Sequence, residues 1–255
     1  MRQIGSVVFW LFVVLSSIPL TVIAFVIWVV TMPFDKRRVV LHRFTCFWAS
    51  LYTWTNPAWP MTITGRENIE AGRTYVLVAN HLSLLDILVL FRLFKDFKWV
   101  SKAEIFKVPG IGWNMRWNKY IALKRGDRES IAEMMAASEA TLRSGSSIMI
   151  FPEGTRSKTG ELKDFKRGAF EMARDTDTAI VPIVIRGTSN ALPKHGFILQ
   201  GRHPISVTVL PEVPLSVVES STTAELSAHV HKLISDELAG DVRQAAGSRR
   251  PDPKI

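Results

Sequence analysis

A long stretch without any charged residue lies near the start of the chain, from Ile4 to Phe34. It exceeds the ~20 apolar residues that a helix needs to cross the hydrocarbon core of a bilayer. It is a poor signal peptide, because its apolar region is too long and residues 29–33 have no small-x-small cleavage pattern. We therefore expect a membrane segment that the mature protein retains.

The charges around this segment predict the side of the membrane on which the rest of the chain lies. Arg2 alone precedes it, whereas Asp35-Lys36-Arg37-Arg38 and Arg43 follow it. The positive-inside rule then places the downstream domain in the cytoplasm, on the inner membrane if the cell is bacterial. Ser16-Ser17-Ile18-Pro19 interrupts the run, so two geometries remain open: one tilted, kinked span, or two half-helices that dip into one leaflet.

Residues 39–59 carry large apolar side chains at helical spacing beside this cationic cluster. They include Phe44, Phe47, Trp48, Leu51 and Tyr52. Aromatic rings next to cations suit the headgroup zone of a membrane, and the alternative is an ordinary core helix with an aromatic stripe. We interpret residues 1–60 as a membrane-associated helical segment.

The net charge and the single cysteine limit the partners of the chain. Its 32 Lys and Arg against 23 Asp and Glu give a charge of +9, which favours an anionic partner such as nucleic acid, an anionic lipid surface or a phosphorylated substrate. Cys46 stands alone, which excludes an intramolecular disulfide and a cysteine metal cluster and indicates a reducing compartment.

Alternating strand-like and helix-like apolar runs predict an α/β domain over residues 61–240. The strand-like runs are 62–64, 74–79, 97–100, 120–123, 147–151, 179–185 and 205–209. The helix-like runs are 87–94, 130–142, a segment that opens at 165, and 223–238. Residues 106–113 and 190–202 read as loops, and Pro182 predicts an edge strand or a bulge. Residues 241–255 are interpreted as a disordered tail.

Asn80-His81-Leu82-Ser83-Leu84-Leu85-Asp86 breaks the apolar pattern between a strand and a helix. His81 falls at the carboxyl end of the strand, where open α/β sheets place their ligands. Ser83 and Asp86 fit an S-x-x-D capping box, which turns the carboxylate back toward His81. Asp86 can then accept the Nδ1 proton and leave Nε2 as a general base for a substrate hydroxyl. The structural alternative is that Asp86 only caps the helix.

Two cationic turns follow later strand-like runs. Lys124, Arg125 and Arg128 surround Gly126-Asp127, an arrangement typical either of a solvated turn or of a phosphate cradle. Pro152-Glu153-Gly154-Thr155-Arg156-Ser157 follows the run at 147–151. Its glycine allows a close approach of backbone N–H groups to a ligand, and its arginine offers a planar fork for phosphate oxygens. Taken alone, this second turn is more typical of an ordinary surface turn.

Taken together, Asn80-His81-x4-Asp86 and Phe151-Pro152-Glu153-Gly154-Thr155-Arg156-Ser157 resemble the glycerolipid acyltransferases that acylate lysophosphatidate. Arg125 stands in place of the arginine of the family's second motif and Val181-Pro182-Ile183 in place of its fourth, so the resemblance covers about Thr62 to Val209. It implies a mixed, mostly parallel sheet flanked by helices, with an amino-terminal hydrophobic helical membrane motif. It also implies transfer of a fatty acyl group from an acyl thioester to the free sn-2 hydroxyl of lysophosphatidate, which gives phosphatidate.

The resemblance also implies roles for individual residues. His81 and Asp86 are the expected catalytic pair, with no metal ion and no covalent acyl-enzyme. The expected substrate-binding residues are Arg125, Glu153, Gly154, Thr155, Arg156, Lys102 and Lys124. Glu153 is expected either to bond the glycerol hydroxyls or to hold Arg156. The partners are a lysophospholipid acceptor, membrane lipids and an acyl thioester donor on CoA or on acyl carrier protein, with no other cofactor and no nucleic acid.

One block departs from the family pattern. The second motif usually has a glycine several positions ahead of its arginine and an acidic residue just before it, whereas this chain has Asn118-Lys119 and Lys124 there. A different lyso-lipid acceptor, such as a lyso-ornithine lipid, is therefore an alternative. A further alternative is a non-catalytic membrane-surface protein, whose basic face and aromatic belt bind anionic lipid.

Overall fold

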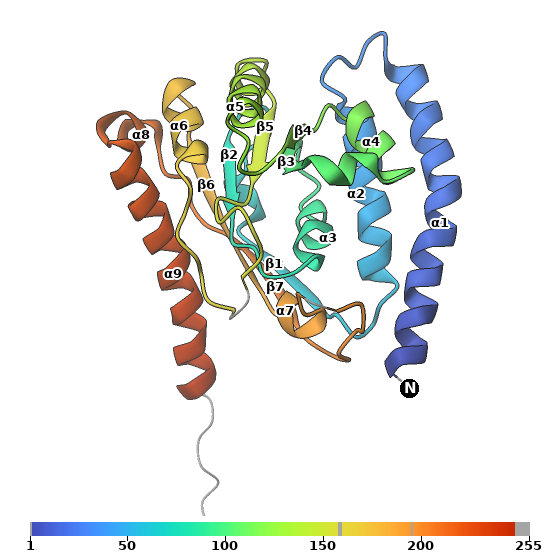
Figure 1. Ribbon diagram of the computed structural model, residues 1–255. Coiled ribbons are helices and arrows are strands. Elements are labelled where there is room, and N and C mark those ends of the chain that lie inside the picture. The colour runs from blue at the N-terminus through green and yellow to red at the C-terminus, as the bar shows by residue number, and fades with distance from the viewer. Residues whose placement is uncertain (1, 158–159, 195, 248–255) are drawn as a thin grey trace, which may run out of the picture.

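The computed structural model describes residues 2–157, 160–194 and 196–247, and it begins with two long helices at one side of the molecule (Figure 1). Helix α1 spans Arg2–Thr31 and helix α2 spans Val39–Trp54. The uncharged run forms one continuous helix with Pro19 inside it, and not two half-helices. By length and composition α1 could cross a membrane.

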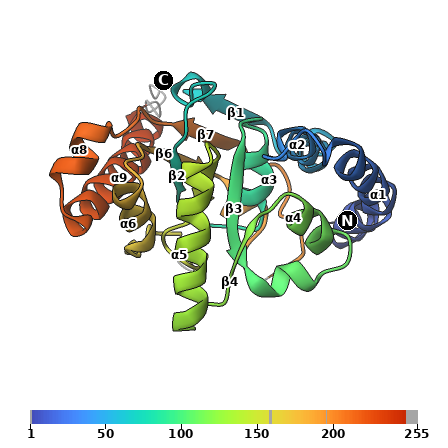
Figure 2. The same ribbon diagram turned by 90° about the horizontal axis from the view of Figure 1, so that it is seen from above.

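One face of α1 packs on the rest of the chain and the other face carries apolar side chains outward. Leu20 and Ala24 are buried in a cluster with Leu41, Trp48 and Tyr52 of α2. The exposed apolar side chains of α1 include Ile4, Val7, Val8, Leu11, Val14, Leu15, Ile18, Val22, Val26, Val29 and Val30. Figure 2 shows α1 at one outer side of the molecule, with α2 between it and the sheet.

The aromatic stripe on α2 divides between core and surface. Trp48 and Tyr52 are buried, whereas Phe47 is 44% exposed and Trp54 is 48% exposed. Helix α2 is covered by α1 on one side and by α3 (Leu85–Phe91) on the other. The expected interfacial helix is therefore in large part a core helix, because two neighbours bury most of its surface.

A seven-stranded sheet forms the centre of the domain, in the order β1-β7-β6-β2-β5-β3-β4. Its strands are β1 (Met61–Thr64), β2 (Val76–Ala79), β3 (Phe97–Lys102), β4 (Ile121–Leu123), β5 (Ser147–Ile150), β6 (Ile180–Arg186) and β7 (Ile205–Val209). All neighbouring pairs are parallel except β6 with β7. The expected mixed, mostly parallel sheet is confirmed.

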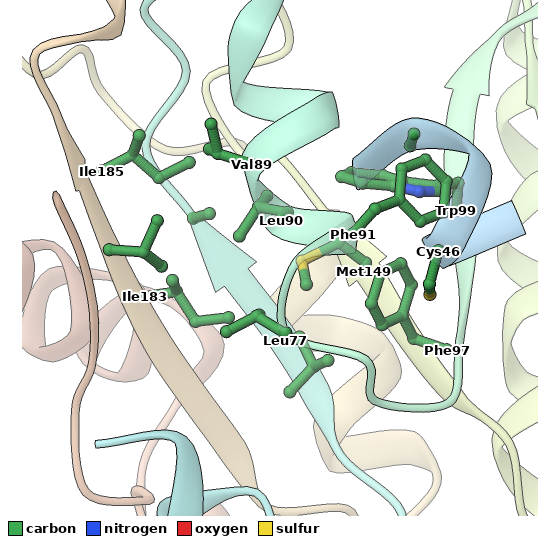
Figure 3. Packing of buried hydrophobic residues seen from close by; sticks show 14 of the residues in the cluster. Cys46, Leu77, Val89, Leu90, Phe91, Phe97, Trp99, Met149, Ile183 and Ile185 are labelled. Atoms are coloured by element: carbon green, nitrogen blue, oxygen red, sulfur yellow. The ribbon is translucent and has the colours of Figure 1, made fainter. Parts of the chain in front are cut away.

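Helices cover both faces of this sheet, because alternate residues of its central strands point to opposite sides. Leu77, Met149 and Ile183 pack on the side of α2 and α3, where Figure 3 shows them with Phe91 and Phe97. The opposite face packs on α5 (Arg128–Arg143), α6 (Gly168–Asp175) and α9 (Thr223–Gly247). Fully buried parallel strands explain the continuous apolar runs in the sequence.

Strand β6 lies between β2 and β7, so Pro182 is not on an edge strand. Pro182 is opposite Val78 of β2, and its carbonyl accepts the N–H of Leu210 at 2.9 Å. The N–H and C=O of one strand residue point to the same side, so the proline nitrogen faces β7. The antiparallel ladder with β7 begins only at Ile183 opposite Val209. The missing donor thus falls outside the ladder.

The pattern missed several short helices. Helix α4 (Ile111–Trp117) begins inside the loop predicted at 106–113, since burial of Met115 and stacking of Trp117 on Trp28 of α1 override the nearby glycines. The other short helices are η1 (Arg66–Asn68), η2 (Ala103–Lys107), α7 (Thr188–Ala191) and α8 (Leu215–Ser220). Helix α9 continues past residue 240, where we expected the tail to begin, and residues 248–255 lie outside the described residues.

Candidate active site

Three neighbouring strands end at the same edge of the sheet and bring the motif residues together. His81 follows β2, the Phe151–Ser157 turn follows β5, and Thr188 follows β6. The order β6-β2-β5 makes these strand ends adjacent, with His81 in the middle. The carboxyl edge of the sheet is where open α/β folds place a ligand.

The predicted contact between His81 and Asp86 is present. His81 Nδ1 lies 2.8 Å from Asp86 Oδ2, which also accepts the backbone N–H groups of Leu82 at 2.6 Å and Ser83 at 2.8 Å. Because a carboxylate only accepts hydrogen bonds, Nδ1 carries the proton. The Nε2 atom of His81 then has its lone pair available to a substrate.

The capping box forms in a modified way. Asp86 bonds the N–H of Ser83, as the motif requires, but the Ser83 hydroxyl donates to the carbonyl of Leu192 at 2.6 Å. The same hydroxyl accepts a long hydrogen bond of 3.3 Å from the N–H of Leu85. Ser83 thus ties this loop to the segment after α7.

Backbone and ring contacts fix His81 from three further directions. Its N–H donates to Glu153 Oε1 at 2.7 Å, and its carbonyl accepts the N–H of Ser157 at 2.9 Å. The Phe151 ring stacks on the imidazole, with 3.9 Å between ring centroids and 8° between planes. The residue is only 8% exposed, so the imidazole has little freedom to turn away from Asp86.

Glu153 braces the site through backbone groups. Its carboxylate is buried and accepts the N–H of His81 and, at 3.3 Å, the N–H of Lys163. Burial raises the pKa of Glu153 to about 7, and the two backbone N–H donors oppose that shift. In the part of the chain that the structure describes, no hydrogen bond joins Glu153 to Arg156, so the expected contact between them is not formed.

Gly154 and Thr155 shape the turn that follows. Gly154 has φ +70°, and a Cβ there would lie 2.9 Å from Cε of Lys166. Any other residue at this position would combine an unfavourable backbone conformation with a steric contact. The Thr155 hydroxyl accepts a hydrogen bond of 2.8 Å from the ammonium group of Lys163, and this bond holds a positive charge beside the turn.

Arg125 and Arg156 follow strands β4 and β5, at the edge of the sheet that also carries His81 and Asp86, which we call the dyad. Arg156 is half-buried and donates to the carbonyl of Lys194 at 3.1 Å, while Lys194 Nζ donates back to the carbonyl of Arg156 at 2.6 Å. Partial desolvation lowers the pKa of Arg125, the positive charge of Arg156 lowers it further, and Glu104 opposes both. The two guanidinium groups are therefore within electrostatic range, which suits an anionic ligand.

Lys102 and Lys124 engage carboxylates of their own loops. Lys102 pairs with Glu104 at 3.1 Å, and Lys124 pairs with Asp127 at 2.7 Å. Both lysines are exposed, and their neighbours neutralise them locally. Each of these two lysines therefore has a carboxylate partner of its own.

Sequence reasoning assigned no role to Asn80 or Thr188. Asn80 is fully buried, and its side chain donates to the carbonyl of Ile185 at 2.9 Å and accepts its N–H at 2.7 Å. Thr188 donates its hydroxyl to Asp86 Oδ1 at 2.5 Å. The available signal in the sequence was an asparagine directly before His81 and a Gly-Thr pair directly after a strand.

A cavity of about 730 Å³ lies between the 160–162 loop and α9, and it reaches Leu82, the residue after His81. It is lined by Leu82, Gly160, Glu161, Leu162, Ile185, Arg186, Gly187, His231, Ser235, Leu238 and Ala239. Pockets of about 300–1,000 Å³ accommodate ligands of drug size. Within the described ranges, no group of three or more His, Cys, Asp or Glu side chains is placed to hold a metal ion.

Comparison with known proteins agrees with this geometry. The family described as Acyltransferase matches residues 60–186, which include the dyad and the arginine pair. A chloroplastic 1-acyl-sn-glycerol-3-phosphate acyltransferase of Arabidopsis thaliana is 42% identical over 162 residues, 63% of this chain and 45% of the relative. Another from Chlamydomonas reinhardtii is 36% identical over 195 residues, 76% of this chain and 58% of the relative. The chain spans about half the length of these curated relatives.

A solved structure shares the whole fold. The crystal structure of the 1-acyl-sn-glycerophosphate acyltransferase PlsC from Thermotoga maritima superposes with a TM-score of 0.75 at 23% identity, covering 94% of this chain and 97% of that chain. The family match, the curated relatives and the arrangement of the motif residues therefore agree, and the chain belongs to the acyltransferase family.

Proposed function

We propose that this chain transfers a fatty acyl group from an acyl thioester to the free sn-2 hydroxyl of lysophosphatidate, giving phosphatidate. The observation that supports it best is the buried Asp86 carboxylate 2.8 Å from His81 Nδ1, which makes Nε2 a base at the sheet edge. The relatives named above carry the corresponding activity in their names.

The chemistry needs one base and no enzyme nucleophile. His81 Nε2 takes the proton of the acceptor hydroxyl while that oxygen attacks the thioester carbonyl. The tetrahedral intermediate then expels the thiolate, and the thiolate takes from the imidazolium the proton that came from the acceptor hydroxyl. Asp86 stabilises the imidazolium and holds its orientation. Ser83 is a poor nucleophile for this reaction, because its hydroxyl is engaged with the Leu192 carbonyl.

Charge complementarity supports a phosphate-bearing acceptor. Arg156 and Arg125 lie close enough to influence each other, and a bound phosphate would relieve that repulsion. Glu153 acts indirectly in this proposal, because its carboxylate accepts a hydrogen bond from the backbone N–H of His81.

The remaining features of the proposal concern the donor and the location. The donor is an acyl-CoA or an acyl carrier protein thioester, and no metal or further cofactor takes part. The exposed apolar face of α1 supports attachment to a membrane, with the domain on its cytoplasmic side. A chelator that abolished the activity of intact protein in detergent would contradict the metal-free mechanism.

The test is an assay of the purified full-length chain in detergent with an acyl thioester and lysophosphatidate. We expect release of free thiol in step with phosphatidate, measured by a thiol reagent and by mass spectrometry of the lipids. Thiol release without phosphatidate would mean hydrolysis, and no release above background would favour a non-catalytic lipid-binding protein.

A panel of lyso-acceptors separates the headgroups. Lysophosphatidate should be turned over fastest. Turnover of a phosphate-free acceptor such as a lyso-ornithine lipid should be slower, because it lacks the phosphate that forms charge-assisted hydrogen bonds with the arginines. Equal or faster turnover of the phosphate-free acceptor would overturn the lysophosphatidate assignment and leave the enzyme class intact.

A further inference from the structure

Thr188 occupies a position that the fold specifies closely. It is the first residue of α7, directly after β6 and Gly187. Gly187 has φ +81°, and a Cβ there would lie 2.0 Å from the carbonyl oxygen of Pro204, so only glycine fits this turn. The turn delivers a fully buried Thr188 side chain to Asp86, with 2.5 Å between Oγ1 and Oδ1.

The hydrogen bonds of Asp86 divide unequally between its two oxygens. Oδ2 accepts from the imidazole of His81 and from the backbone N–H groups of Leu82 and Ser83. Among the described residues, Thr188 supplies the one donor to Oδ1. Asp86 is fully buried, so removal of that hydroxyl would leave Oδ1 with no partner among the residues that the structure describes.

Two further contacts hold the end of β6 and α7 against the His81 loop, one on each side of Thr188. The Asn80 side chain bonds both the N–H and the carbonyl of Ile185. The Ser83 hydroxyl bonds the carbonyl of Leu192. These contacts join the segment before Thr188 and the segment after it to the loop that carries the dyad, so the threonine hydroxyl has a fixed place.

We propose that Thr188 is a positioning residue of the reaction, the third member of a His81–Asp86–Thr188 chain. This inference rests on the proposed acyl transfer and assigns the residue that sets the carboxylate. Thr188 keeps Oδ1 bonded and thereby holds the carboxylate of Asp86 with Oδ2 aimed at Nδ1 of His81. It touches neither substrate, and it acts only through Asp86.

The test begins with substitutions that separate the hydroxyl from the shape of the side chain. Thr188→Val keeps the size and removes the donor, and we expect kcat to fall about tenfold with KM for both substrates unchanged, because one hydrogen bond to a charged group is lost. Thr188→Ser keeps the donor and should retain kcat within about twofold. Melting curves of each variant establish that it is folded, and Thr188→Ala replaces the valine variant if that one does not fold.

Thr178 is a matched control at the other end of β6. It is also a buried threonine, and its hydroxyl bonds the carbonyl of Thr176 at 3.1 Å, before β6 begins and so at the end of this strand opposite to Thr188. Thr178→Val should change the melting temperature and leave kcat unchanged. A general sensitivity of β6 to loss of a buried hydroxyl would lower kcat in both variants and would overturn the proposal.

A double variant decides whether Thr188 acts through Asp86. The Asp86→Asn enzyme has already lost the charge that Thr188 stabilises, so adding Thr188→Val should reduce kcat no further. If the losses of kcat from Asp86→Asn and Thr188→Val multiply in the double variant, the inference is overturned. A folded Thr188→Val enzyme with full kcat would overturn it too. In both cases an active wild-type protein would leave the proposed acyl transfer in place. A wild-type protein that releases no thiol would instead refute the proposed function, and the role of Thr188 with it.

Discussion

His42 and His81 are both buried histidines, but their nitrogens have opposite surroundings. In His42, Nδ1 lies 2.7 Å from the Tyr120 hydroxyl and Nε2 lies 2.9 Å from the carbonyl oxygen of Lys95, so both nitrogens are engaged. In His81, Nδ1 is engaged by Asp86, and the described residues form no hydrogen bond to Nε2. His42 and His81 therefore differ in one ring nitrogen: Nε2 of His81 is available to a substrate, whereas Nε2 of His42 is bonded to a backbone carbonyl.

The electrostatics of the two sites strengthen this contrast. Burial lowers the pKa of His42 to about 3, the positive charge of Lys98 adds to that shift, and the backbone carbonyl of Lys95 opposes it. Within the described ranges no carboxylate bonds the His42 ring, whereas Asp86 lies against the ring of His81. His42 thus stays neutral during any reaction at neutral pH, and His81 has a partner that stabilises its charged form.

The largest expected effect is on the histidine with the free nitrogen. His81→Ala should lower kcat by ~10²–10⁴, which is the usual contribution of a general base. His42→Ala should lower the melting temperature and leave kcat of the folded fraction nearly unchanged. Steady-state turnover and thermal melts of both variants test this, and a comparable loss of kcat in the His42 variant would remove the contrast.

Asp86→Asn should come next, with kcat lower by ~10²-fold or more. The amide keeps the shape and much of the capping, but it removes the charge and can select the wrong tautomer of His81. Because the two side chains act as one unit, the His81→Ala, Asp86→Asn double variant should be scarcely worse than His81→Ala alone. If the two losses multiply in measured kcat, the residues act independently and the dyad is refuted.

His42 should make the protein sensitive to acid. The unfolded chain binds a proton at His42 below about pH 6.5, while the folded chain resists protonation until about pH 3. Stability is therefore fully present above pH 6.5 and is lost as the pH falls toward 3, by on the order of 4 kcal/mol from this group. Denaturant unfolding at several pH values measures it.

A control variant isolates the contribution of His42 to that slope. The free energy of unfolding of His42→Gln should depend less on pH between 6.5 and 3. This variant should also be less stable at pH 7, because it loses the packing of the buried imidazole ring. His229→Gln, at an exposed position on α9, should leave the slope unchanged. Equal slopes in the wild type and the His42 variant would show that this histidine is not held neutral.

Glu153 should give a pH dependence of the opposite sign. Its pKa of about 7 lies above the ordinary 4.5, so the unfolded chain releases this proton at lower pH than the folded chain. Stability is then greatest below pH 4.5 and falls as the pH rises to 7, by on the order of 3 kcal/mol. Unfolding of Glu153→Gln should lack this fall, and Glu129→Gln, at an exposed position, should retain it. A Glu153→Gln curve parallel to that of the wild type would contradict the raised pKa.

The sequence was sufficient for the parts of the site that are local in the chain. His81 and Asp86 are five positions apart at a strand end, so a capping motif was enough to predict their contact. The α/β class followed from the alternation of strand-like and helix-like runs, and the mixed, mostly parallel sheet was implied by the resemblance to the glycerolipid acyltransferases.

The rest depends on strand order, which the pattern does not supply. Thr188 meets Asp86 and Asn80 meets Ile185 only because β6 lies next to β2, although more than 100 residues separate the partners. Glu153 was expected to serve a ligand or Arg156, and its actual partner is the backbone N–H of His81 on the neighbouring strand end. Contacts between strand ends are therefore the ones that sequence reasoning missed.

The smallest expected effect separates the capping of α3 from the chemistry of His81. Ser83→Ala removes a hydroxyl that bonds the Leu192 carbonyl and the Leu85 N–H, but it keeps the backbone N–H that Asp86 accepts. The loss should be ~1 kcal/mol of stability, which lowers the melting temperature by roughly 2–4 °C in a domain of this size. Turnover should stay within about twofold, because the contact between Asp86 and His81 does not pass through the Ser83 side chain. Melting temperature and kcat, measured on one preparation beside Asp86→Asn, make the comparison.

A Ser83→Ala enzyme with normal melting and a hundredfold lower kcat would make this hydroxyl part of the reaction. An Asp86→Asn enzyme that matches Ser83→Ala in both measurements would reduce Asp86 to a helix cap and leave His81 no different in kind from His42.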